Sequence, residues 1–92
     1  MEITELLPIG TLVKLHQSDE KFMIYGRKIT RANTGQVFDY LACLYPYGFV
    51  SNEYTAFFNG SSISEVVYQG YEDEEEGKFK HSLKERLLAE GE

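Results

Sequence analysis

The sequence contains few of the residues that bind metals or cross-link a chain. It has a single cysteine, Cys43, and two histidines, His16 and His81. One cysteine excludes a disulfide framework and a cysteine-based metal site, and two histidines exclude a histidine-rich site. No apolar run approaches the roughly 20 residues that span a bilayer. We therefore expect a protein without a cofactor, a metal ion or membrane insertion.

The beginning of the chain shows no targeting signal. Residues 1–5 are Met-Glu-Ile-Thr-Glu, an acidic stretch where a secretory signal peptide would be basic. We therefore expect a cytoplasmic protein. Its 92 residues, 42% of them hydrophobic, suffice for one domain with its own core, so the predicted single domain spans residues 1–92.

Acidic residues outnumber basic residues by fifteen to nine, which gives a formal net charge of -6. This balance disfavours nonspecific binding to nucleic acid, because cationic side chains supply most of that affinity. Most of the excess comes from one acidic run: Glu72, Asp73, Glu74, Glu75 and Glu76. Two interpretations stay open. The run is either a solvated helix start that meets the positive end of the helix dipole, or an electrostatic contact for a basic partner.

Alternating apolar residues predict a β-hairpin in the first third of the chain. Residues 9–16 and 22–29 are rich in strand-forming residues, and a polar turn separates them. Gly26 interrupts the second segment and suggests a bulge or a bend there. Residues 31–35 are expected to form the next turn, since asparagine and glycine tolerate positive φ.

The most apolar stretch, residues 37–45, predicts a central strand with one face on a barrel interior and the other under a C-terminal helix. Cys43 lies within it, so we expect a buried, inert thiol. Residues 53–58 are ambiguous between a strand and a helical turn, and their composition favours the strand. Residues 63–71 alternate as a last strand.

The tail changes to a helical period. Phe79, Leu83 and Leu87 recur at i, i+4 and i+8, which predicts an amphipathic helix over about residues 73–90 that packs on the sheet. Asp73 or a neighbouring residue can cap this helix.

Two glycines bear on where the helix begins and ends. Gly77 disfavours a helix interior and could delay the start, and Gly91 is available as a stop. Short strands followed by one helix indicate a mainly β fold of the α+β class. A small antiparallel curled sheet or SH3-like barrel of four or five strands fits best.

No combination of residues points to catalysis, so we expect no enzyme. His16 could approach a nearby carboxylate, but a third partner is missing. Asp39 stands in an apolar strand and must bind a strand neighbour, Arg27 or Arg31. A solvated basic edge is expected from Lys21, Arg27, Lys28 and Arg31.

Aromatic residues crowd the window of residues 45–58. Two or three of these rings must fill the core of so small a domain. The others would be exposed at a loop, and exposed aromatic residues often mark protein contacts. We expect the partner-binding residues to be Tyr45, Pro46, Tyr47, Gly48, Phe49 and Tyr54.

Several blocks of the chain resemble one family. They are residues 6–13, 21–27, 38–49 and 58–71, and the Leu-Tyr-Pro-x-Gly-Phe block is the most specific of them. In this order they are similar to small Firmicutes proteins catalogued as domain of unknown function 4176, over about residues 6–80.

This resemblance implies genomic company with type VII secretion loci and LXG-type toxins, and it brings no assigned catalytic residues. We therefore expect a non-catalytic, chaperone-like accessory protein that binds a secreted toxin or another secretion component. The alternative is an immunity-type inhibitor whose acidic run occupies the basic cleft of a nuclease. A small enzyme is the least favoured possibility.

Overall fold

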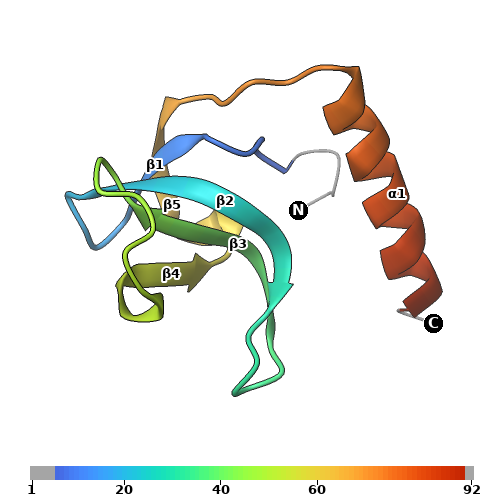
Figure 1. Cartoon of the computed structure of the whole chain (residues 1–92), viewed down its shortest axis with the longest axis horizontal. Coiled ribbons are helices and arrows are strands. Elements are labelled where there is room, and N and C mark those ends of the chain that lie inside the picture. Colours follow the sequence, from blue (N-terminus) through green and yellow to red (C-terminus); the bar gives the residue numbers. More distant parts are fainter. Residues whose placement is uncertain (1–5, 91–92) are drawn as a thin grey trace.

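The structure, a computed structural model, describes residues 6–90 as a five-stranded antiparallel sheet and one helix (Figure 1). The elements are β1 (Leu12–Leu15), β2 (Lys21–Thr30), β3 (Val37–Leu44), β4 (Thr55–Phe58), β5 (Ile63–Tyr68) and α1 (Glu74–Glu90). The strand order is β4-β3-β2-β1-β5, and two 3-10 turns, η2 (Asn52–Tyr54) and η3 (Gly60–Ser62), flank β4. No helix within residues 6–90 is long and apolar enough to cross a membrane.

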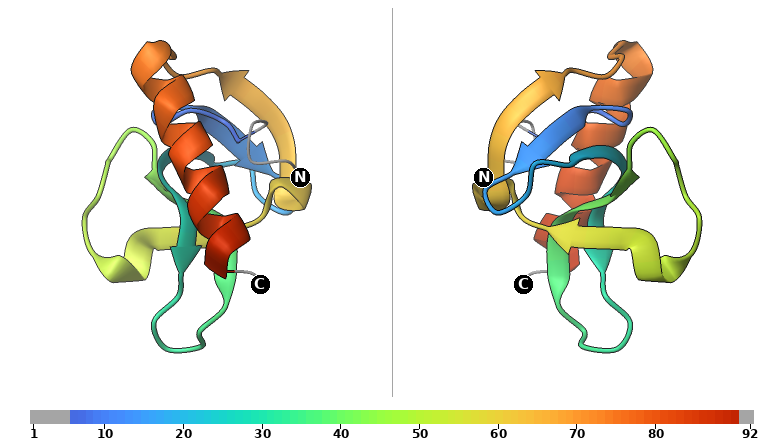
Figure 2. Two further views of the ribbon diagram at one scale, coloured as in Figure 1. Left: turned by 90° about the vertical axis from the view of Figure 1, so that its right-hand side faces the viewer. Right: turned by 90° about the vertical axis from the view of Figure 1, so that its left-hand side faces the viewer.

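The sheet is strongly curled and α1 lies along one side of it (Figure 2). This arrangement confirms the predicted fold class, a curled antiparallel sheet with one C-terminal helix. β1 and β2 form the expected hairpin. Ile24 pairs with Ala42 and Gly26 with Leu41, so Tyr25 is the extra residue of a bulge at the position that Gly26 predicted.

The core lies between the sheet and α1. Its buried side chains come from the N-terminal segment, four strands and the helix: Leu6, Val13, Ile24, Tyr40, Ala42, Phe58 and Leu83. The expectation that helix and barrel interior cover opposite faces of residues 37–45 is wrong, because Leu83 packs in the same cluster as Tyr40 and Ala42. The middle of the strand order is β2, so β3 is interior but not central. Cys43 lies on the other face of β3 and is buried, as predicted.

The start of α1 is set by a side-chain cap. The backbone N–H of Glu76 donates to Asp73 Oδ1 at 3.1 Å, which satisfies one of the unpaired amides of the first turn. The helix therefore begins at Glu74, and the later start expected from Gly77 is wrong. The predicted stop at Gly91 lies outside the described residues.

The buried stripe of α1 differs from the predicted one. Leu83 and Leu87 pack on the core, but Phe79 is exposed. The Arg27 guanidinium carbon lies 4.8 Å from the centroid of the Phe79 ring. Glu76 and Lys80 take the inward positions before Leu83. The N-terminal half of α1 therefore contacts the sheet mainly through charged side chains.

Arg27 is the centre of this ionic contact, which we name the Arg27 cluster: Arg27, Glu76 and Lys80. Arg27 holds both Glu76 carboxylate oxygens, with Nη2 at 2.9 Å from Oε1, and the Arg27 side chain is only 4% exposed. Lys80 Nζ lies 3.6 Å from the same carboxylate. The hydrogen bonds from Arg27 outweigh burial and, with both positive charges, lower the pKa of Glu76 below its usual value.

The same arginine fixes the N-terminal segment. Arg27 Nη1 donates to the Leu7 carbonyl oxygen at 3.3 Å, and the Leu7 N–H donates to the Tyr40 hydroxyl at 3.0 Å. Thr11 adds a second tie, since its hydroxyl donates to the Pro8 carbonyl at 2.7 Å and accepts the Gly70 N–H at 3.0 Å. The segment before β1 is thus held by β2, β3 and the chain after β5.

Replacing Glu76 by glutamine should lower the free energy of unfolding at neutral pH. Arg27 would keep its buried position without a counter-charge, which costs about 3–5 kcal/mol. Because the folded-state pKa of Glu76 lies below the usual 4.5, its contribution is present above pH 4.5 and is lost as the pH falls below that value. Urea denaturation should therefore show a wide gap between wild type and E76Q at pH 7 that narrows toward pH 3. Glu75→Gln, at an exposed neighbour, is the control, and a gap that is constant with pH would contradict the role of the ion pair.

Adding a methyl group at Gly70 should destabilise the fold. A Cβ there would lie 2.3 Å from the Ile9 carbonyl oxygen and 3.0 Å from the Thr11 nitrogen, so the backbone must move. We expect Gly70→Ala to cost about 1–3 kcal/mol in thermal or urea denaturation. Gly77→Ala is the matched control, because its Cβ meets open space in α1 and should stabilise by up to about 1 kcal/mol. Equal stability of the two variants would rule out the close approach.

Candidate functional site

The segment from Tyr45 to Tyr54 joins β3 to β4 and carries most of the exposed rings; we name it the aromatic loop. Tyr47 and Phe49 are 73% and 58% exposed, and Tyr45 and Tyr54 are exposed as well. The Tyr45–Pro46 peptide bond is cis, and Gly48 takes a φ of +77° that favours glycine. These residues are the predicted partner-binding set, and the structure brings them together on one loop.

The aromatic loop encloses a shallow apolar hollow of about 340 Å³. Its lining residues are Leu44, Tyr47, Gly48, Val50 and Tyr54. Val50 is exposed too, and most of the surface of this hollow is apolar. A concave apolar patch with tyrosines at its rim is typical of a protein-binding surface, because each ring contributes large contact area and a polar tip.

Several contacts hold the aromatic loop in place. The Tyr45 N–H donates to the Lys21 carbonyl at 2.9 Å, and the Gly48 N–H donates to the Leu44 carbonyl at 2.9 Å. Phe49 packs edge-on against Tyr25 with centroids 6.3 Å apart, which places Phe49 on the sheet surface and outside the core. Burial, and then the neighbouring Cys43 thiol, raise the pKa of Tyr25.

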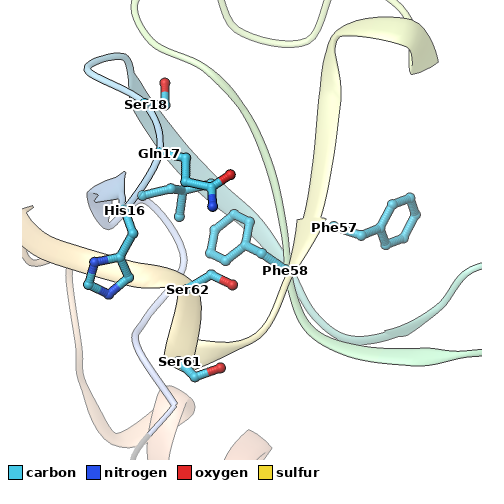
Figure 3. A pocket seen from close by; sticks show the side chains of 8 residues that line it. His16, Gln17, Ser18, Phe57, Phe58, Ser61 and Ser62 are labelled. Atoms are coloured by element: carbon cyan, nitrogen blue, oxygen red, sulfur yellow. The ribbon is translucent and has the colours of Figure 1, made fainter.

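The remaining two rings of the predicted window point to opposite faces of β4. Phe58 belongs to the buried core, where it lies against Tyr40 and Phe22. Phe57 lies on the other face, against Phe38, with the Arg31 guanidinium over it. Figure 3 shows the two rings directed away from each other. The strand expected at residues 53–58 is confirmed for β4, and the residues before it form the turn η2.

The acidic run is largely engaged within the chain. Glu76 binds Arg27, Asp73 caps α1, and Glu72 binds Gln69 and lies 3.5 Å from Lys80 Nζ. Glu74 and Glu75 are exposed in the first helical turn, where they face the positive end of the helix dipole. The helix-start interpretation describes this run better than a free acidic surface does, and neither interpretation included the ion pair with Arg27.

Asp39 is a structural carboxylate. It binds Lys28 Nζ at 2.7 Å and accepts the Gly60 N–H at 2.9 Å, so its partner is the strand neighbour Lys28 and neither Arg27 nor Arg31. Burial raises the pKa of Asp39, but the hydrogen bonds from Lys28 and Gly60 and the charge of Lys28 outweigh it and lower the pKa below its usual value. Asp39 therefore stays ionised and ties β3 to the turn after β4.

The basic edge expected from Lys21, Arg27, Lys28 and Arg31 does not form as a unit. Arg27 is buried against Glu76, and Lys28 is bound to Asp39. Lys28 also takes a left-handed φ of 49°, a strained conformation for a residue with a side chain.

A second hollow, of about 480 Å³, lies between β4, η3 and the turn after β1 (Figure 3). It is lined by Leu15, His16, Gln17, Ser18, Phe57, Phe58, Ser61 and Ser62. A histidine beside two serines raises the question of a nucleophile, which requires a hydrogen bond between hydroxyl and imidazole. Within residues 6–90 no such bond joins His16 to Ser61 or Ser62, and no group of His, Cys, Asp or Glu is placed to hold a metal ion.

Sequence reasoning missed the Arg27 cluster and the hollow beside β4. The signal for the first was present, since an arginine within the apolar strand of residues 22–29 must be paired if it is buried. The second had no such signal, because its lining comes from two stretches, residues 15–18 and 57–62, that are far apart in the sequence.

Comparison with known proteins bears on the family of this chain. The sequence matches, over residues 6–79, the family described as Domain of unknown function (DUF4176). No curated protein and no solved structure matches the chain. The match includes the aromatic loop and the acidic run, and its extent agrees with the resemblance over about residues 6–80. The chain therefore belongs to the DUF4176 family of domains of unknown function.

Proposed function

We propose that this chain is a non-catalytic cytoplasmic accessory protein that binds another protein through the aromatic loop. The observation that carries the proposal is the exposure of Tyr47, Phe49 and Tyr54 around an apolar hollow. The apolar surface of such exposed rings is unfavourable in water, so its burial by a partner lowers the free energy of the complex.

The construction of the loop supports binding with little loss of entropy. Backbone bonds of Tyr45 and Gly48 hold its first turn, and Phe49 rests on Tyr25. A surface that is already ordered loses less conformational freedom when a partner docks, so more of the contact energy appears as affinity.

The class of partner follows from the resemblance, which implies an LXG-type toxin or another component of type VII secretion. Such a partner would present an apolar segment to Tyr47 and Val50, and the complex would hold the toxin before export in a chaperone-like manner.

The alternative, an immunity-type inhibitor that uses the acidic run, has weaker support. Three of its five acids are bound within the chain, and an inhibitor that mimics phosphates needs them free. Contact with the active site of a toxin and loss of toxicity would favour the inhibitor over the accessory protein.

Shortening Tyr47 should weaken partner binding without unfolding the protein. The LXG-type protein encoded beside this chain would be expressed and purified. It would then be titrated against the wild type and Tyr47→Ala by calorimetry. Loss of a central ring should weaken binding at least tenfold, about 1.4 kcal/mol, with a nearly unchanged melting temperature, because Tyr47 is outside the core.

Tyr71→Ala is the matched control, since Tyr71 is more exposed than Tyr47 and lies outside the aromatic loop. Both variants should melt like wild type, and only Y47A should lose affinity. Unaltered binding of folded Y47A would show that the aromatic loop is not the contact surface.

A further inference from the structure

One edge of the sheet is an open strand with a groove beside it. β4 is last in the strand order, and among the strands of residues 6–90 it pairs with β3 alone. The hollow of about 480 Å³ runs between β4 on one side and the β1–β2 turn and η3 on the other (Figure 3). An edge strand carries backbone groups without a partner strand, and here they border a space of ligand size.

The backbone groups that face the groove can be assigned from the ladder. The Tyr45 N–H donates to Lys21, toward β2, and backbone groups alternate along a strand. Ala42 therefore turns its N–H and C=O toward β4, where Ala56 is its partner. It follows that Phe57, one residue further on, directs its N–H and C=O outward.

β4 lacks two of the features that usually prevent edge pairing, a charge and a proline, although it is only four residues long. Its sequence, Thr-Ala-Phe-Phe, contains no charge and no proline, and its register against β3 is regular. The opposite edge is different, because β5 carries Glu65 and two irregularities in its pairing with β1. Of the two edges, β4 is the one suited to accept another strand.

The lining of the groove indicates what would occupy it. None of its eight residues is an aspartate, glutamate, lysine or arginine, so a charged occupant would lose its hydration without gaining an ion pair. Leu15 and Phe58 offer apolar contact, whereas Gln17, Ser61 and Ser62 offer hydrogen bonds. These chemistries suit an extended chain with alternating small apolar and neutral polar side chains.

We propose that β4 is a strand-addition site for an uncharged, extended peptide segment of a partner protein. The segment pairs with the outward N–H and C=O of Phe57 and lays alternate side chains toward Phe58. Such pairing takes its affinity from main-chain hydrogen bonds and its specificity from the pockets for alternate side chains. The site is separate from the Tyr47 contact and does not depend on it.

Amide exchange tests the geometry before any ligand is used. In the free protein, the Phe57 amide should exchange with solvent at least tenfold faster than those of Ala56 and Phe58, which face β3. Equal protection of all three amides in the free protein would overturn the proposal.

A display library of random heptapeptides, selected on the full chain, then supplies the probe. The selected peptides should be uncharged and alternating, and the strongest should slow exchange of the Phe57 amide. Ser61→Lys places a charge in the groove and should weaken that peptide at least tenfold, whereas Ser82→Lys on α1 should not. Gln17→Lys gives a second variant at an exposed lining position, and the melting temperature of each shows that it is folded.

Three outcomes would overturn the proposal. One is a library without enrichment on the wild-type chain, and another is a peptide that binds S61K and wild type equally. The third is self-association of the free chain through β4, which would make a second copy the occupant. Peptides that shift the signals of Tyr47 and Tyr54 instead would assign peptide binding to the aromatic loop and count against β4.

Discussion

A buried arginine is the constraint around which this small fold is arranged. The Arg27 guanidinium leaves water, and a charge in that position is tolerated only when it is paired and hydrogen-bonded. Glu76 supplies the charge, the Leu7 carbonyl supplies an acceptor, and the Phe79 ring covers the cation. One side chain on β2 therefore holds both the helix and the N-terminal segment against the sheet.

This constraint explains why α1 packs although its apolar stripe is short. Among the helix side chains that the structure describes, residues 74–88, Leu83 and Leu87 are the two that reach the core, and the ionic contact provides the second point of attachment nearer the start of the helix. The acidic run thus acts mainly within the molecule: one acid caps the helix, one binds Arg27 and one lies beside Lys80. Much of the excess negative charge therefore stabilises the fold through contacts within the chain.

The features that suit binding lie at the β4 end of the sheet. The aromatic loop joins β3 to β4, and Tyr54 directly precedes β4, whose free edge borders the uncharged groove. β5, at the opposite edge, is irregular and is tied through Gly70 to the N-terminal segment. The sheet therefore has one edge tied to the rest of the chain and one edge that is available, next to its most exposed rings.

Local patterns determined the elements of this protein, and long-range contacts decided what those elements present. The alternation in residues 9–16 and 22–29, the bulge at Gly26, the helical period of the tail and the cap at Asp73 all depend on neighbours in the chain, so they could be predicted. The aromatic loop could be predicted as a candidate because Pro46 and Gly48 mark a turn. The inward face of α1 and the pairing of Arg27 with Glu76 could not. Arg27 and Glu76 are 49 positions apart in the sequence, and they meet only because α1 packs against the curled sheet.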